Sequence, residues 1–162
     1  MPLYFAYGSC MNPLDISRTV EAEFIGTGKL LNHRLGFTFY SSRRDGGVAD
    51  IVKVAGHFVE GVLLRVPDFN KLDTRENCPI VYKRRKIRVH TDNNYIYAYT
   101  YEVVNKSFRE IKPSSHYENL IVEGARKYLS AEYNESLSVN LQKDRELVVI
   151  GNQLDNLYEF LF

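Results

Sequence analysis

The chain of 162 residues has no tryptophan, two cysteines and four histidines, and these shortages argue against several classes of protein. Cys10 and Cys78 cannot build the disulfide framework of a small secreted domain, and they lack the spacing of a paired-thiol or zinc motif. The histidines stand apart, without the i, i+4 pair of a zinc enzyme. A P-loop and a Gly-x-Ser-x-Gly elbow are also missing. We therefore expect no metal site.

Long apolar runs and an excess of one charge are missing too. No segment approaches the roughly 18 apolar residues that span a membrane, and the N-terminus does not resemble a signal peptide. The chain has 21 basic and 20 acidic residues. The basic run Lys83–Lys86 alternates between two strand faces, which disfavours a concentrated nucleic-acid surface. We expect a soluble, cytoplasmic protein that binds neither membrane nor nucleic acid; its oligomeric state is left open.

The residues that are present favour a single domain over 1–162, since 44% are hydrophobic and 13% are aromatic. Strand patterns dominate the first two thirds and helix patterns the last third. This order predicts an α+β fold, a small curved or closed β-barrel with a few flanking α-helices. The expected strands are Leu3–Tyr7, Glu23–Leu31, Arg34–Tyr40, Val48–Val54, His57–Val66, Ile80–His90 and Tyr95–Val104.

Several connections and helices follow from local signals. Asn32-His33 is expected to join two strands, and Thr91–Asn94 to turn a hairpin. Short helices are expected after Asn12-Pro13 and after Pro67-Asp68. A capping box at Ser115–Glu118 predicts a helix to about Ser130. Two further helices are expected near Ser138–Val148 and Asn152–Phe160.

The segment Leu3–Met11 is the most informative part of the chain. The strand Leu3–Tyr7 stops at Gly8-Ser9, and a strand that ends in such a loop leaves backbone N–H groups free to bind an anion. An ordinary strand and turn has the same pattern. Ser9 is either a turn residue or a nucleophile. Cys10 is either a small buried residue or a thiol activated beside a helix.

Glu76 is a second candidate. It lies in Leu72-Asp73-Thr74-Arg75-Glu76-Asn77, between a short helix and the strand expected from Ile80. The mouth of a barrel would lie at such a junction, although a solvated surface glutamate has the same pattern.

Four separated segments together resemble the γ-glutamylcyclotransferase-like family, which includes the plant avirulence-induced proteins. The segments are Tyr4–Ser9, the glycine-rich stretch Gly46–Ile51 with Glu60–Leu63, Leu72–Glu76 with Tyr82, and Pro113–Tyr117. They stand in the family's order over about residues 3 to 130. Two positions depart from it: Cys10 stands where Asn is common, and Asn77 where Gly often follows the glutamate.

The resemblance implies a cofactor-independent transferase or lyase that closes a γ-glutamyl amide to 5-oxoproline and releases an amine. It implies Glu76 as the general acid and base. It also implies substrate binding by Tyr7, Gly8, Ser9, Cys10 and Tyr117, whereas Tyr82 is expected in the core. The alternative is a non-catalytic module of the same fold that binds a small carboxylate. The leaving amine is not predicted.

Overall fold

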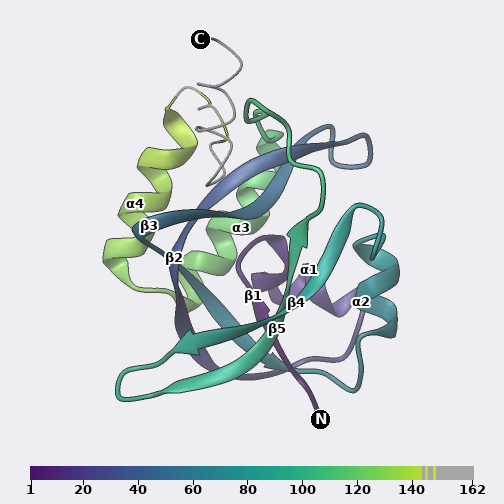
Figure 1. Cartoon of the computed structure of the whole chain (residues 1–162), viewed down its shortest axis with the longest axis vertical. Coiled ribbons are helices and arrows are strands. Elements are labelled where there is room, and N and C mark those ends of the chain that lie inside the picture. Colours follow the sequence, from purple (N-terminus) through teal and green to yellow (C-terminus); the bar gives the residue numbers. More distant parts are fainter. Residues whose placement is uncertain (144, 146–147, 149–162) are drawn as a thin grey trace, which may run out of the picture.

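A closed barrel forms the centre of the molecule (Figure 1). The computed structural model describes residues 1–143, 145 and 148. The strand order around the barrel is β1-β3-β2-β4-β5, and a parallel bridge between Tyr4 and Tyr99 closes it. The other neighbouring pairs are antiparallel. The predicted α+β barrel is thus confirmed. Its strands are β1 (Leu3–Ala6), β2 (Glu23–Ser41), β3 (Gly46–Arg65), β4 (Tyr82–His90) and β5 (Tyr95–Val103).

The two longest strands correct the sequence prediction. Glu23–Leu31 and Arg34–Tyr40 are not joined by a turn at Asn32-His33, because both belong to the continuous strand β2. Asn32 has a φ of 59°, and the register with β3 shifts there, so this point is a bulge. Likewise, Val48–Val54 and His57–Val66 form one strand, bent at Gly56 with φ 83°. Strands β2 and β3 are therefore joined by a single reversal of the chain, between Ser41 and Gly46.

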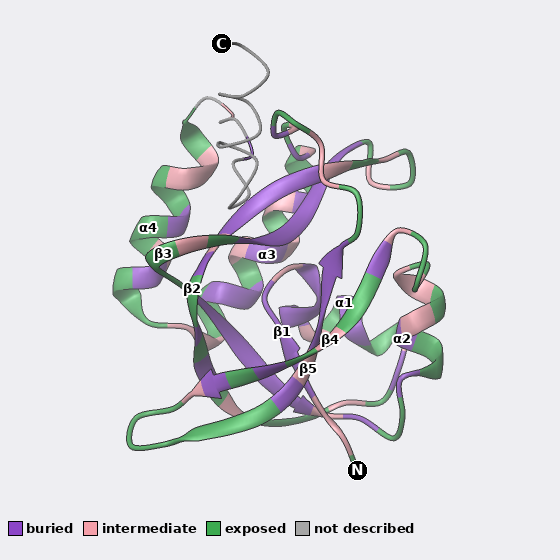
Figure 2. Ribbon diagram, in the orientation of Figure 1, coloured by how far each residue is buried: buried purple, intermediate pink, exposed green. Residues whose placement is uncertain are grey.

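The β4–β5 hairpin is confirmed, with its turn between His90 and Tyr95. Its outer surface is largely exposed (Figure 2). Part of the basic run on this hairpin is paired with acidic residues. Arg84 binds Asp73 at 2.6 Å, and Lys83 and Arg85 lie 3.7 and 3.3 Å from Glu102. Opposite charges therefore offset three of the four residues of the run Lys83–Lys86.

The helices lie outside the barrel and differ from the predictions at two points. Helix α3 is present, but its N-cap is Ser114, whose hydroxyl accepts from the N–H of Tyr117; Ser115 is already helical. The helix predicted near Ser138–Val148 is wrong in position: α4 begins after the N-cap Ser130. The helix predicted at Asn152–Phe160 lies outside the described residues. The helices are α1 (Pro13–Ser17), α2 (Asn70–Arg75), α3 (Ser115–Tyr128) and α4 (Ala131–Gln142), and η1 (Ser9–Met11) is a 3₁₀ turn.

Close backbone packing connects α3 and its entry segment to the barrel. A Cβ on Gly47 would lie 2.0 Å from the carbonyl oxygen of Ile111, and the N–H of Gly47 donates to the carbonyl of Lys112. A Cβ on Gly124 of α3 would meet the backbone of η1 within 3 Å. Glycine at these places lets residues 111–114 and η1 approach closely. This packing positions Tyr117 and the loop after β1. No helix among the described residues is long and apolar enough to cross a membrane.

Candidate active site

A cavity of about 440 Å³ opens at one end of the barrel. Its walls come from the end of β1, the β2–β3 turn, the start of β4, the end of β5 and the first turn of α3. Every residue that the sequence predicted for the site lines this one cavity: Tyr7, Gly8, Ser9, Cys10, Glu76 and Tyr117. Residues more than 100 positions apart therefore meet in one place.

The loop after β1 presents free backbone donors beside this cavity. The N–H groups of Met11 and Asn12 donate to the carbonyls of Gly8 and Ser9. The N–H groups of Gly8, Ser9 and Cys10 donate to no acceptor within the described part of the chain. Gly8 packs closely against Ala49, because a Cβ added to Gly8 would lie 3.1 Å from the methyl group of Ala49. Such a run of free N–H groups can hold a carboxylate or an oxyanion.

Glu76 projects from the C-terminal end of α2, where its N–H caps the helix by donating to the carbonyl of Leu72. Its side chain is 18% exposed, and one carboxylate oxygen lies 3.6 Å from Nε of Arg75. Burial raises the pKa of the Glu76 carboxyl, although Arg75, Arg44 and Arg43 each oppose that rise. A shielded carboxyl with a raised pKa can both take up and release a proton.

The backbone conformation of Asn77 explains why glycine or asparagine suits the position after Glu76. Its φ is 48°, in the left-handed region that glycine and asparagine tolerate best. The chain turns there, and the N–H groups of Ile80 and Val81 donate to the carbonyl of Asn77. The departure from glycine at Asn77 therefore preserves the turn that presents Glu76.

Buried tyrosines form much of the remaining wall. The Tyr7 hydroxyl donates to the carbonyl of Tyr101 at 2.5 Å, and the Tyr117 hydroxyl accepts from the N–H of Ala49 at 2.9 Å. Tyr82, expected in the core, is buried but also lines the cavity, and its hydroxyl donates to the carbonyl of Ala49. Burial raises the pKa of Tyr7, Tyr82 and Tyr117, so these hydroxyls stay protonated at neutral pH.

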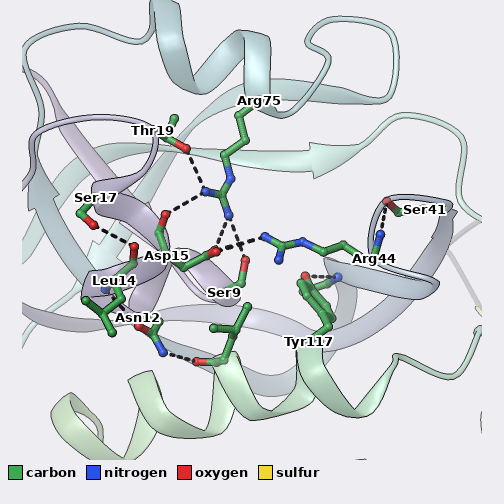
Figure 3. A network of polar contacts seen from close by, with 12 residues as sticks. Ser9, Asn12, Leu14, Asp15, Ser17, Thr19, Ser41, Arg44, Arg75 and Tyr117 are labelled. Carbon is green, nitrogen blue, oxygen red and sulfur yellow. Dashed lines mark hydrogen bonds and ion pairs between the residues drawn. The ribbon is translucent and has the colours of Figure 1, made fainter.

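An ion-pair network around Asp15 connects the loop to Arg75, which stands beside Glu76, and sequence reasoning missed it. Figure 3 shows Asp15 between Arg75 and Arg44, with Ser9 beside Arg75. Asp15 of α1 lies between two guanidiniums, 2.5 Å from Arg75 and 3.2 Å from Arg44. Arg75 also donates to the hydroxyls of Ser9 and Thr19. The only signal in the sequence is that Arg75 directly precedes Glu76. Nothing local indicates that Asp15 would meet it.

Cys10 is buried at the same place, and it does not have the surroundings of a reactive thiolate. Burial raises the pKa of its thiol to about 11, although the charge of Arg75 opposes the rise. A thiol with this pKa is almost fully protonated at neutral pH. The interpretation of Cys10 as a small buried residue is therefore favoured.

Comparison with known proteins agrees with this geometry. The model of the AIG2-like family matches residues 58–137. A solved structure named gamma-glutamyl cyclotransferase superposes with a TM-score of 0.81 at 25% identity, covering 98% of both chains. The chain is thus similar to the AIG2-like family and to a γ-glutamylcyclotransferase structure. A human structure, described as uncharacterized protein loc79017, also superposes with a TM-score of 0.81, at 26% identity over 97% of both chains.

One curated relative is a longer protein. The chain is 34% identical over 142 residues to "Putative gamma-glutamylcyclotransferase YkqA" of Bacillus subtilis (strain 168). The match covers 83% of this chain but 50% of the relative, so the chain spans about half of that protein's length. The crystal structure of YkqA superposes with a TM-score of 0.78 at 30% identity, over 88% of this chain and 54% of that one. The family's fold is thus shared across much of this chain.

Proposed function

We propose that the chain is a γ-glutamylcyclotransferase, which converts a γ-glutamyl amide into 5-oxoproline and a free amine. The observation that carries this proposal is the arrangement of Glu76. Its shielded carboxyl shares one cavity with the free N–H groups of Gly8, Ser9 and Cys10. The printed names of the relatives support the same reaction class.

The reaction needs an acid and base but no nucleophile from the protein. The substrate's α-amine attacks its own γ-carbonyl carbon, forming the ring C–N bond, and the bond to the leaving nitrogen breaks. Because attack is intramolecular, a cavity that holds the folded conformer supplies much of the acceleration. Glu76 takes one proton from the α-ammonium and delivers it to the leaving nitrogen as the C–N bond breaks. The second proton that the ring nitrogen loses ends on the released amine, which leaves as an ammonium ion.

The loop after β1 supplies hydrogen-bond donors that complement the negative charge of the substrate. Its free N–H groups would hold the α-carboxylate of the substrate or the oxyanion that develops at the γ-carbonyl. The tyrosine hydroxyls around the cavity remain neutral, so they shape it and hydrogen-bond without adding negative charge beside Glu76. A pure binding module would gain nothing from a lone carboxylate facing an anionic ligand, and for this reason we favour the enzyme.

Incubation with a panel of γ-glutamyl amides tests the proposal directly. We expect stoichiometric 5-oxoproline and free amine from at least one amide, measured by liquid chromatography with mass detection. The comparison is the same amides without enzyme, since γ-glutamyl compounds cyclise slowly by themselves. Saturable binding of these amides with no 5-oxoproline would instead support the non-catalytic module.

Replacement of Cys10 separates the intramolecular reaction from thiol catalysis. We expect Cys10→Ser to retain kcat within about fivefold, because a thiol protonated at neutral pH is not needed when the substrate carries its own amine. Protein quenched during turnover should have its unmodified mass. Loss of all activity, or a glutamyl adduct on Cys10 in the unaltered protein, would make the enzyme a thiol acyltransferase.

A further inference from the structure

Helix α2 presents Glu76, but the helix is too short to hold its own position. It has 6 residues, Asn70–Arg75, of which Leu72 is buried. A helix of this length is unstable by itself in water, because nucleating its first turn costs more than its few hydrogen bonds return. The place of Glu76 in the cavity therefore depends on the contacts that tie α2 to the rest of the fold. The ion pair between Arg75 and Asp15 is one of them.

Asp73 supplies a second contact, because its carboxylate bridges α2 to both strands of the β4–β5 hairpin. One carboxylate oxygen accepts from the Tyr101 hydroxyl at 2.6 Å, and the other accepts from the Arg84 guanidinium at 2.6 Å. Arg84 of β4 and Tyr101 of β5 stand opposite each other in the strand register. Hydrogen bonds to an ionised carboxylate are stronger than neutral ones, and here both oxygens are engaged.

The partners of Asp73 are themselves held in place. The Arg84 guanidinium lies over the ring of Phe69, 4.7 Å from its centroid, and Phe69 is the N-cap residue of α2. Tyr101 is 2% exposed, and its carbonyl accepts from the Tyr7 hydroxyl in the cavity wall. Burial and the hydrogen bond to Asp73 raise the pKa of Tyr101, so its hydroxyl remains a donor at neutral pH. The contact therefore joins α2 to anchored parts of the barrel.

The location of Asp73 suits an indirect role in the reaction. Asp73 and Glu76 stand three residues apart, a spacing that places two side chains on the same side of a helix. The carbonyl of Asp73 also accepts from the N–H of Cys78, so its backbone braces the turn after Glu76. Asp73 does not line the cavity that holds Glu76. Its influence on a substrate in that cavity must therefore pass through other residues.

We propose that Asp73 is a positioning residue, which holds the Glu76 carboxyl at its place in the cavity by binding α2 to Tyr101 and Arg84. This role rests on the proposed cyclotransferase function. Loss of the contact would free α2 to move away from the hairpin and would admit water to the Glu76 carboxyl.

Such a movement would change the titration of Glu76. Burial is the largest influence on the pKa of this carboxyl and raises it, so entry of water should lower the pKa toward the ordinary value of a glutamic acid. The charged groups that also act on this pKa are Arg43 and Arg44 of the β2–β3 turn, Arg75 of α2 and Asp15 of α1. A substitution at Asp73 leaves all four in the chain.

Two variants break the contact from its two ends: Asp73→Ala and Tyr101→Phe, which removes only the hydroxyl. We expect Asp73→Ala to lower kcat for 5-oxoproline release about tenfold or more, with KM within about threefold. The midpoint of the acid limb of kcat/KM should move to lower pH by at least about half a unit. Alanine favours a helix more than aspartate does, so helix propensity cannot explain a loss.

Tyr101→Phe keeps the buried ring and should change kcat and the pH midpoint in the same directions. In the double variant, kcat should fall no further than in Asp73→Ala, because both changes break one contact. Circular dichroism verifies the fold of each variant. Lys71→Ala is the control, an exposed residue of the same helix that lines neither cavity, and it should keep the kcat and the pH midpoint of the unaltered chain.

Three results would overturn the positioning role: an unchanged kcat in Asp73→Ala, a lower kcat with an unmoved pH midpoint, or additive losses in the double variant. In the last two cases Asp73 would act on something other than Glu76 or independently of Tyr101. The proposed function would stand in all three, since the unaltered chain would still form 5-oxoproline. Absence of 5-oxoproline from the whole panel of γ-glutamyl amides would overturn both.

Discussion

Glu76→Gln should lower kcat about a hundredfold or more while KM changes by no more than a few fold. Glutamine keeps the shape of the side chain and its hydrogen bonds, but it cannot exchange a proton with the α-ammonium or the leaving nitrogen. The measurement is steady-state release of 5-oxoproline, with circular dichroism to verify the fold. Glu135→Gln, an exposed change on α4, is the matched control and should retain full activity.

The pH dependence of kcat/KM provides a second test of the role of Glu76. The base must be ionised in the free enzyme, so kcat/KM should fall as pH falls through the pKa of Glu76. Because burial raises the pKa of this carboxyl, the midpoint should lie above the ordinary value of a glutamic acid. Glu76→Gln should lose this acid limb. A variant that stays active with an unchanged pH profile would show that another group carries the proton.

Asp15→Asn should lower the free energy of unfolding by about 3 kcal/mol, since removing one partner leaves buried charge uncompensated. The Asp15 side chain is 4% exposed, and it neutralises both Arg75 and Arg44. The measurement is urea unfolding at neutral pH. Glu23→Gln breaks an exposed pair with Arg65, whose side chains are 64% and 39% exposed, and should cost less than about 1 kcal/mol.

The same substitution should change stability in a pH-dependent way. Asp15 is desolvated, but hydrogen bonding and charge from Arg75, with the charge of Arg44, hold the pKa of its carboxyl below the usual range. The stabilisation of the folded state by ionised Asp15 is therefore fully present above the pKa of an aspartic acid in the unfolded chain, about 4. It is lost as the pH falls through the lower pKa that Asp15 has in the folded protein. The difference between the unaltered chain and Asp15→Asn should shrink in acid. Equal losses for Asp15→Asn and Glu23→Gln at neutral pH would contradict the role of the network.

The Asp15 network also connects stability to the candidate site. Arg75 binds Asp15, donates to the Ser9 hydroxyl and stands beside the Glu76 carboxylate. Loss of Asp15 should therefore loosen the loop that carries the free N–H groups. We expect Asp15→Asn to raise KM as well, even under conditions where the variant remains folded.

The sequence was most informative where the physical signal is local. Alternation of side chains and the turn before Tyr95 predicted the β4–β5 hairpin, and the Gly8-Ser9 turn predicted a loop with free donors. The same local logic failed at Asn32. A residue in the left-handed region of backbone conformation occurs both in hairpin turns and in bulges. At Asn32 the structure is a bulge because the chain on both sides of it pairs with β3.

By itself, the sequence determined the α+β class, the hairpin, the loop after β1 and the candidate glutamate at the end of α2. Only the tertiary structure decided that Asp15 meets Arg75 and that Tyr82 faces the cavity. Hydrogen bonding in turns and side-chain alternation act over a few residues, so a single segment contains their signal. A charge pair or a cavity wall depends on which distant segments barrel closure brings together, and that placement is set by packing of the whole chain.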